Sequence, residues 1–240
     1  MILQNKNVLV TGATGGLGTA LAKAYLKKGC NLFLTGRSNN KLQLLCNDLQ
    51  LDNVDAKIMF SACDLRDYDD IMWFTRKVKQ SFNQIDILVN CAGIFQIKNL
   101  QEINIQEYNE CMHVNLTAPV ILIKEFSKEM IKNKWGRIIN IASSSAYSGT
   151  ALTSAYCASK HALLGLSRSL YKEFKNFGVR VICVSPGTIK TPMGAEVTKL
   201  GQDYDTFMDA DEVAEYVVYN TAFDGNLISE EIRLNRVYVQ

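Results

Sequence analysis

The stretch Asn7-Val-Leu-Val-Thr-Gly-Ala-Thr-Gly-Gly-Leu-Gly18 decides the fold of this 240-residue chain. Residues 6–10 form a short apolar run typical of a buried strand, and residues 17–28 repeat apolar side chains at helical spacing. The glycines between them let the backbone turn tightly and let a pyrophosphate approach the free N–H groups at the start of the helix. A plain tight turn is the alternative, but the position in a βα unit favours a dinucleotide site. We expect its contacts to be Gly12, Thr14, Gly15, Gly16, Leu17 and Gly18.

Strand and helix patterns alternate along the rest of the chain. Apolar runs predict further strands at 31–35, 56–62, 85–90, 136–141, 179–185 and 231–237. Helical spacing predicts helices at 41–49, 67–82, 103–133, 154–177 and 211–220. Pro119 lies inside one of them, which must therefore be kinked or consist of two helices. The alternation is typical of an α/β protein with a doubly wound parallel sheet, covered by helices on both faces. We expect a single Rossmann domain over residues 1–240, with about seven strands and a ligand crevice at their carboxyl ends.

The composition excludes several classes of protein. Apolar residues make up 48% and charged residues 21%, as in ordinary globular proteins, and the formal net charge is +2. No basic block suggests a nucleic-acid partner, no apolar run reaches the roughly 18 residues of a membrane span, and no cationic leader precedes the first strand. The seven cysteines form no C-x-x-C pair, and His113 and His161 have no ligand cluster nearby, so we predict no metal. These features predict a cytoplasmic protein with reduced cysteines.

A second signal is the pair Tyr156 and Lys160, with Ser143 thirteen residues before the tyrosine. In a helix, residues at i and i+4 lie on one face, so the phenol and the ammonium would share one space. A free tyrosine has a pKa of about 10, and a nearby cation lowers it. A shift of about three units needs roughly 4 kcal/mol, so a second positive charge, such as that of an oxidised nicotinamide, would have to contribute. The pair suggests a general acid/base poised near neutral pH, although such pairs also occur by chance on surface helices.

The end of the second predicted strand bears on the choice of dinucleotide. Most NAD-binding folds of this type place an acidic residue there, which binds the ribose 2′-hydroxyl. Here Gly36 stands at that point, and Arg37 and Ser38 follow. A guanidinium can hold a 2′-phosphate with two hydrogen bonds, and a charged hydrogen bond is worth about 1.5–3 kcal/mol, or roughly ten- to a hundredfold in affinity. We therefore expect NADP(H) rather than NAD(H); a solvated surface arginine is the alternative.

Together these motifs resemble the short-chain dehydrogenase/reductases of the NADP-dependent type. The match runs from the glycine turn through Asn90-Cys-Ala-Gly93, Asn115, Ser143 and Tyr156-x3-Lys160 to Pro186-Gly-Thr-Ile-Lys-Thr191. Cys91 is the visible departure from the family's Asn-Asn-Ala-Gly motif. The resemblance places further cofactor contacts at Asp64, Leu65, Asn90, Ala92, Gly93, Pro186, Gly187, Ile189 and Thr191, although some of these could be turn chemistry alone.

The resemblance also implies a role for each catalytic residue. Tyr156 would donate or accept the proton, and Ser143 would bind the substrate oxygen together with it. Lys160 would lower the tyrosine pKa and bind the nicotinamide ribose. Asn115 would hold a water in the proton relay to Lys160. The chain would then be an NADP(H)-dependent oxidoreductase that interconverts a secondary alcohol and a carbonyl compound by hydride transfer, with segment 188–209 as a lid over a small or medium substrate.

Three alternatives remain open at this point. One is a ketoacyl-carrier-protein-type reductase, whose acidic carrier protein could meet the stripe Lys124, Lys128 and Lys132. The C-terminal sequence from Glu230 to Gln240 is more similar to reductases of small hydroxy acids or related alcohols. The second is a non-catalytic NADP-binding sensor, and the third is a nucleotide-sugar epimerase, for whose usual C-terminal substrate domain this chain has no length.

Relatives in this family pair through their two long helices, so the resemblance implies a homodimer or homotetramer. The small residues Ala158, Ala162 and Gly165 would permit close packing on the second of these helices, or they could face the sheet.

Overall fold

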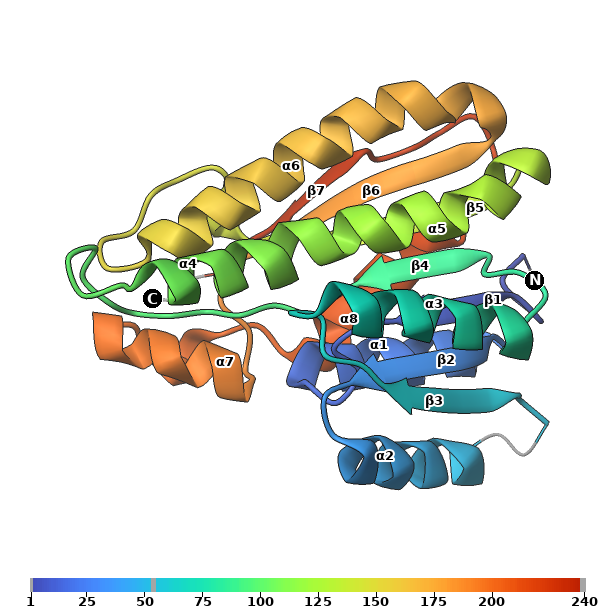
Figure 1. Ribbon diagram of the computed structural model, residues 1–240, viewed down its shortest axis with the longest axis horizontal. Coiled ribbons are helices and arrows are strands. Elements are labelled where there is room, and N and C mark those ends of the chain that lie inside the picture. The colour runs from blue at the N-terminus through green and yellow to red at the C-terminus, as the bar shows by residue number, and fades with distance from the viewer. Residues whose placement is uncertain (1, 53–54, 238–240) are drawn as a thin grey trace.

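The computed structural model describes residues 2–52 and 55–237. Over these residues, seven strands form one sheet in the order β3-β2-β1-β4-β5-β6-β7 (Figure 1). Every neighbouring pair is parallel, which confirms the predicted doubly wound α/β fold. The strands are β1 (Asn7–Val10), β2 (Asn31–Gly36), β3 (Ile58–Ala62), β4 (Ile87–Asn90), β5 (Gly136–Ile141), β6 (Val179–Pro186) and β7 (Glu231–Leu234).

Helices cover both faces of this sheet. Because side chains alternate along a strand, Val8 and Val10 of β1 pack in one core with α1, α2 and α8, while Leu9 packs in a second core with α3 and α5. The helices are α1 (Gly16–Lys27), α2 (Asn39–Asp52), α3 (Tyr68–Ser81), α4 (Ile105–Met112), α5 (Ala118–Lys132), α6 (Ser154–Phe174), α7 (Pro192–Ala195) and α8 (Ala210–Thr221).

The predicted helix over 103–133 is two helices joined by a π-helical turn at His113–Thr117. Pro119 lies in the first turn of α5, where the missing N–H costs least. The prediction for 154–177 needs a smaller correction, because α6 ends at Phe174 and a 3₁₀ turn leads to Gly178 at φ 73°.

Other boundaries also differ from the sequence-based prediction: the strands expected at 56–62 and 85–90 each begin two residues later, and the helix expected at 41–49 runs on to Asp52. Helix α2 begins at Asn39, two residues earlier than expected, because the Ser38 hydroxyl oxygen accepts from the Lys41 N–H at 3.3 Å and so caps its first turn. Strand β7 ends at Leu234, where its register with β6 ends at Pro186, so the predicted strand 231–237 is too long. Residues 238–240 of the C-terminal sequence lie outside the described residues.

The strand order places the ligand crevice. The chain winds outward from β1 to β2 and β3, then returns to the other side of β1 to form β4. A doubly wound sheet opens a crevice at the carboxyl ends of the strands where the winding direction reverses, here between β1 and β4. In the described ranges, no helix has the length and the apolar character that crossing a membrane requires.

Candidate active site

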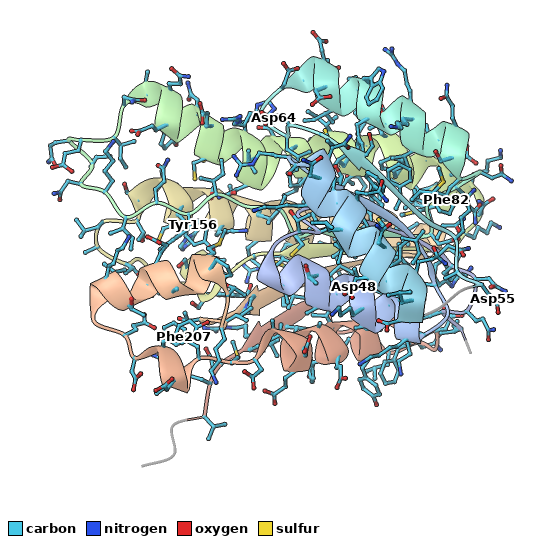
Figure 2. The ribbon with its side chains drawn as sticks, turned by 90° about the horizontal axis from the view of Figure 1, so that it is seen from below. Asp48, Asp55, Asp64, Phe82, Tyr156 and Phe207 are labelled. Carbon is cyan, nitrogen blue, oxygen red and sulfur yellow. The ribbon has the colours of Figure 1, made fainter. Side chains whose placement is uncertain are left out.

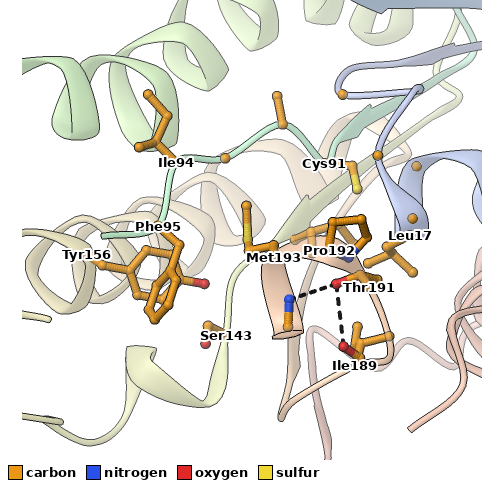
Figure 3. Close-up of a pocket in the computed structure, with 18 of the residues that line it drawn as sticks. Leu17, Cys91, Ile94, Phe95, Ser143, Tyr156, Ile189, Thr191, Pro192 and Met193 are labelled. Atoms are coloured by element: carbon orange, nitrogen blue, oxygen red, sulfur yellow. Dashed lines mark hydrogen bonds between the residues drawn. The ribbon is translucent and has the colours of Figure 1, made fainter. Parts of the chain in front are cut away.

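A cavity of about 590 Å³ lies at the carboxyl edge of the sheet (Figure 3). Its walls come from the segments that follow β1 to β6 and from residues 187–202. Of the predicted site residues, the structure brings to this cavity Gly12, Thr14, Gly15, Gly16, Leu17, Gly18, Arg37, Asp64, Leu65, Ala92, Gly93, Ser143, Tyr156, Lys160, Pro186, Gly187, Ile189 and Thr191. Ser38, Asn90 and Asn115 are not among the lining residues. Within the described ranges, no three His, Cys, Asp or Glu side chains are grouped to hold a metal ion.

The glycine turn is pressed against its neighbours so closely that side chains would not fit. Gly12 has φ 64°, and a Cβ there would lie 2.8 Å from the Ala92 Cα. A Cβ on Gly16 would lie 2.5 Å from the Thr191 Cγ2. Gly15, the N-cap of α1, offers no side-chain hydrogen bond to the first turn. The first N–H groups of α1 therefore meet the cavity without a side-chain cap, as an anion-binding helix start requires.

Charged side chains gather at the end of the cavity beyond β2 and β3. Arg37 is exposed, and Lys41, four residues later in the first turn of α2, lines the same cavity. Asp64 is held by Arg66, whose Nη2 donates to Oδ2 at 2.6 Å and whose Nε donates to Oδ1 at 2.9 Å. These hydrogen bonds hold the pKa of the Asp64 carboxyl below its usual range. Arg66 also lies 3.6 Å from Glu110 of α4, so it joins this end of the cavity to that helix.

Sequence reasoning missed both Lys41 and Arg66. For Lys41 a signal was available, since it stands at the start of the helix predicted at 41–49, only four residues after Arg37. For Arg66 no comparable signal exists, because its pairing with Asp64 depends on the shape of the turn after β3.

Asn90 acts beneath the cavity rather than in it. Its Nδ2 donates to the Asn140 Oδ1 at 2.8 Å, and the Asn140 Nδ2 donates to the Ser167 Oγ at 2.9 Å. This buried chain joins β4, β5 and α6. The backbone that follows β4 is held instead by Thr11, whose Oγ1 accepts from the N–H groups of Cys91 at 3.0 Å and Ala92 at 3.1 Å.

Asn115 lies in the π-helical turn and is 1% exposed. Its Nδ2 donates to the Ser159 Oγ at 2.9 Å, beside the catalytic candidates on α6. A Cβ on Gly93 would lie 3.4 Å from the Asn115 Oδ1 and 3.8 Å from the Lys160 Nζ. The π-turn thus places this carboxamide near Lys160, and single π-turns are frequent at functional sites.

Ser143, Tyr156 and Lys160 meet in the same part of the cavity, where Figure 3 shows Ser143 near the tyrosine. The Lys160 Nζ donates to the Ile141 carbonyl at 2.8 Å and lies 5.7 Å from the centre of the Tyr156 ring. Phe95 packs edge-on against that ring, with the centroids 4.9 Å apart. The Ser143 Oγ accepts from the Ser145 N–H at 3.1 Å, which leaves the hydroxyl hydrogen of Ser143 to donate elsewhere.

Burial dominates the electrostatics of Tyr156 and Lys160. It raises the pKa of Tyr156 to about 12, and the neighbouring Ser143 hydroxyl offsets part of this effect. Burial also lowers the pKa of Lys160 to about 8. The tyrosine pKa therefore moves away from neutrality, opposite to the effect expected from Lys160, because burial disfavours the phenolate. A further positive charge is required to bring it down.

Segment 188–209 folds over one side of the cavity. It contains α7 and two 3₁₀ turns, Glu196–Leu200 and Tyr204–Thr206. The Thr191 Oγ1 accepts from the Gly194 N–H at 3.0 Å and caps α7. The two ends of the segment are joined by backbone hydrogen bonds, from Lys190 to Met208 at 2.8 Å and from Met208 to Thr188 at 3.1 Å. Its lining side chains include Met193, Val197, Leu200 and Gln202.

Comparisons with known proteins agree with this geometry. Residues 6–200 match the family model described as short chain dehydrogenase. An uncharacterized oxidoreductase of Staphylococcus saprophyticus is 33% identical over 217 residues, which cover 90% of this chain and 91% of that protein. A 3-oxoacyl-acyl-carrier-protein reductase of Rickettsia bellii is 35% identical over 191 residues, 80% of this chain and 76% of its own. The crystal structure of a metagenomic short-chain oxidoreductase in complex with NADP is 29% identical, has a TM-score of 0.84 and covers 98% of this chain and 99% of its own.

The doubly wound sheet, with a glycine turn and a Ser–Tyr–Lys group at its carboxyl edge, defines a Rossmann-type oxidoreductase. The family model and the relatives match most of the length, so the chain belongs to the short-chain dehydrogenase family.

Proposed function

We propose that this protein is an NADP(H)-dependent oxidoreductase that interconverts a secondary alcohol and a carbonyl compound. The observation that carries the proposal is that one cavity joins the glycine turn, the cations beyond β2 and the Ser143–Tyr156–Lys160 group. A dinucleotide laid along it would span all three, and the NADP complex of the metagenomic relative supports that choice of cofactor.

The residues present fit NADP(H). The turn at Gly12 and Gly16 leaves no room for side chains, and the uncapped start of α1 suits a pyrophosphate. Arg37 and Lys41 offer two cations to a 2′-phosphate, and no carboxylate stands at Gly36 to repel it. Asp64 and Leu65 would adjoin the adenine, while Pro186, Gly187, Ile189 and Thr191 would adjoin the nicotinamide. When bound, the nicotinamide supplies or accepts the hydride.

Tyr156 would serve as the general acid/base. With a pKa of about 12 its phenol is protonated near neutral pH, as carbonyl reduction requires. Lys160, with a pKa of about 8, still carries its proton at neutral pH in most molecules, so its charge would stabilise the phenolate left after proton transfer. The Ser143 hydroxyl, beside the phenol, would donate to the substrate oxygen, a contact worth about 3 kcal/mol in the transition state. Asn115 would hold the water molecule of the proton relay to Lys160.

We further propose that segment 188–209 is a lid over the substrate and that one domain holds both cofactor and substrate sites. The lid wall is largely apolar at Met193, Val197 and Leu200, which suits a small or medium carbonyl compound.

A carrier-protein-linked substrate is the second candidate, because of the similarity to the Rickettsia reductase. The lysine stripe on α5 gives it little support. Lys128 lies 3.6 Å from Glu125, and Lys132 lies 3.5 Å from Glu129, so two of the three cations face acidic neighbours of their own.

The test is NADPH consumption with a panel of aldehydes, ketones, keto acids and β-ketoacyl esters, with NADH in parallel. We expect turnover with NADPH that Tyr156→Phe lowers at least about a hundredfold, because the variant keeps the ring and loses the proton. NADPH binding, measured by its fluorescence, should not change. Tight NADPH binding without turnover of any carbonyl, and without an effect of the substitution, would instead indicate a sensor.

A further inference from the structure

Arg236, two residues beyond β7, reaches across to segment 188–209. Its Nη1 donates to the Thr206 Oγ1 at 2.7 Å, and its Nη2 donates to the Gln202 Oε1 at 3.2 Å. Its guanidinium also lies 5.5 Å from the centre of the Phe207 ring, and Figure 2 places Phe207 on the lid side of the molecule below Tyr156. Arg236 thus contacts the C-terminal part of the lid, at residues 202–207.

The contact of Arg236 with the lid matters because, within the described ranges, few other bonds hold segment 188–209 to the rest of the protein. The backbone bonds from Lys190 and Met208 hold only its two ends. Among the described residues, the other side-chain hydrogen bonds of 195–206 stay within the segment, such as Thr198 to the Ala195 carbonyl at 2.8 Å. Arg236 itself is anchored to the sheet close by, since the Gly187 N–H donates to the Leu234 carbonyl at 2.8 Å. The arginine therefore connects residues 202–206 of the lid to the sheet.

The same contact fixes the orientation of Gln202, which lines the cavity. A guanidinium has donors only, so the atom of Gln202 that faces Arg236 must be the oxygen. That oxygen also accepts from the Thr188 Oγ1 at 3.0 Å. With Oε1 held by two donors, the NH₂ group is the part of the carboxamide that remains to donate to a ligand.

We propose that Arg236 is a positioning residue: it holds the lid in place and orients Gln202 so that its NH₂ group can bind an oxygen of the substrate. The inference rests on the proposed function, and it adds that the substrate carries a hydrogen-bond acceptor on the lid side of its reacting carbonyl. It also assigns a task to the C-terminal segment, which the catalytic residues do not require.

Arg236→Ala tests the proposal, and Arg233→Ala is the matched control. Arg233 lies three residues earlier, is exposed and packs over the Tyr147 ring at 4.0 Å, away from the lid contacts. With the carbonyl compound that the panel identifies, Arg236→Ala should raise KM about tenfold and change kcat less than about threefold. Arg236→Lys should recover part of the loss, since it keeps a cation that donates from one nitrogen and loses the two-nitrogen fork. The dissociation constant of NADPH should stay within about twofold in all three variants.

Hydrogen exchange of the lid amides provides a readout that needs no turnover. Exchange across residues 198–206 should quicken in Arg236→Ala and stay unchanged in Arg233→Ala. An unchanged exchange rate, an unchanged KM, or equal effects of the two substitutions would overturn the proposal. A wild-type protein that binds NADPH and reduces nothing would refute the proposed function alone, and the exchange experiment would still decide whether Arg236 holds the lid.

Discussion

The Asn115 carboxamide binds both backbone polar groups of Ile94: its Oδ1 accepts from the Ile94 N–H at 2.7 Å, and its Nδ2 donates to the Ile94 carbonyl at 2.9 Å. Ile94 lies in the cavity wall directly after the Asn90–Gly93 motif. With the further bond to Ser159, one side chain of the π-turn joins the loop after β4 to α6. Asn115 is therefore a structural clamp of the site, whatever part it has in proton transfer.

Asn115→Ala should destabilise the fold as well as lower activity. The substitution leaves the Ile94 N–H and carbonyl without their partner, so the free energy of unfolding should fall by about 2–4 kcal/mol. Chemical denaturation would measure the change. Asn109→Ala, at an exposed position of α4, is the control and should change stability by less than about 0.5 kcal/mol. Equal stability of the two variants would contradict the clamp.

The lowered pKa of Lys160 predicts how stability changes with pH. The unfolded chain holds this proton up to a pKa of about 10.4, whereas the folded protein releases it at about 8. Between these values the unfolded state binds more protons, so this residue adds stability as the pH rises. Relative to Lys160→Met, the wild type should gain about 2 kcal/mol between about pH 8 and pH 9.5. Paired urea titrations at these pH values would measure the gain, and a difference independent of pH would show that Lys160 is not desolvated.

Arg37 and Lys41 should discriminate between the two dinucleotides. Arg37→Ala should weaken NADPH binding by roughly ten- to a hundredfold and leave NADH binding unchanged, because only the 2′-phosphate loses a partner. Lys41→Ala should act in the same direction with a smaller effect, since an ammonium binds through one point. Fluorescence titration measures both dissociation constants. Arg76→Ala, which removes an exposed arginine of α3, controls for net charge. If Arg37→Ala weakened NADH binding as much as NADPH binding, Arg37 would not contact the 2′-phosphate.

Local patterns in the sequence were enough to predict the sheet, the glycine turn and the pairing of Tyr156 with Lys160, whereas the place of Ser143 beside them followed from the family resemblance. The first three depend on periodicity or on short spacing, which chain geometry converts directly into position. The direction of single side chains was harder to predict. Asn90 belongs to a motif at the end of β4, yet its side chain points beneath the cavity to Asn140, since neighbouring strand residues point to opposite faces.

Periodicity and spacing could not predict contacts between single side chains of segments that are distant in sequence. The π-turn that carries Asn115 has no apolar spacing that would reveal it. Pro119 indicated that the helix predicted at 103–133 is interrupted, but not that the interruption is a π-turn. Arg236 meets Gln202 and Thr206 across about thirty positions because the lid returns beside β7. The pKa of Tyr156 likewise depends on burial, which spacing does not reveal.

The outer face of α6 bears on assembly. Ala158 and Gly165 are exposed rather than turned to the sheet, and a Cβ on Gly165 would meet nothing within 4 Å. In a monomer, Gly165→Ala should therefore stabilise the protein by about 1 kcal/mol, because it improves helix propensity at no steric cost.

If this face packs closely against a second copy, as the expected homodimer or homotetramer requires, Gly165→Arg should dissociate the assembly. Light scattering after size-exclusion chromatography would measure the mass of each variant. Gln43→Arg, at an exposed position of α2, should leave that mass unchanged. An oligomer that survives Gly165→Arg would show that the copies meet through another face.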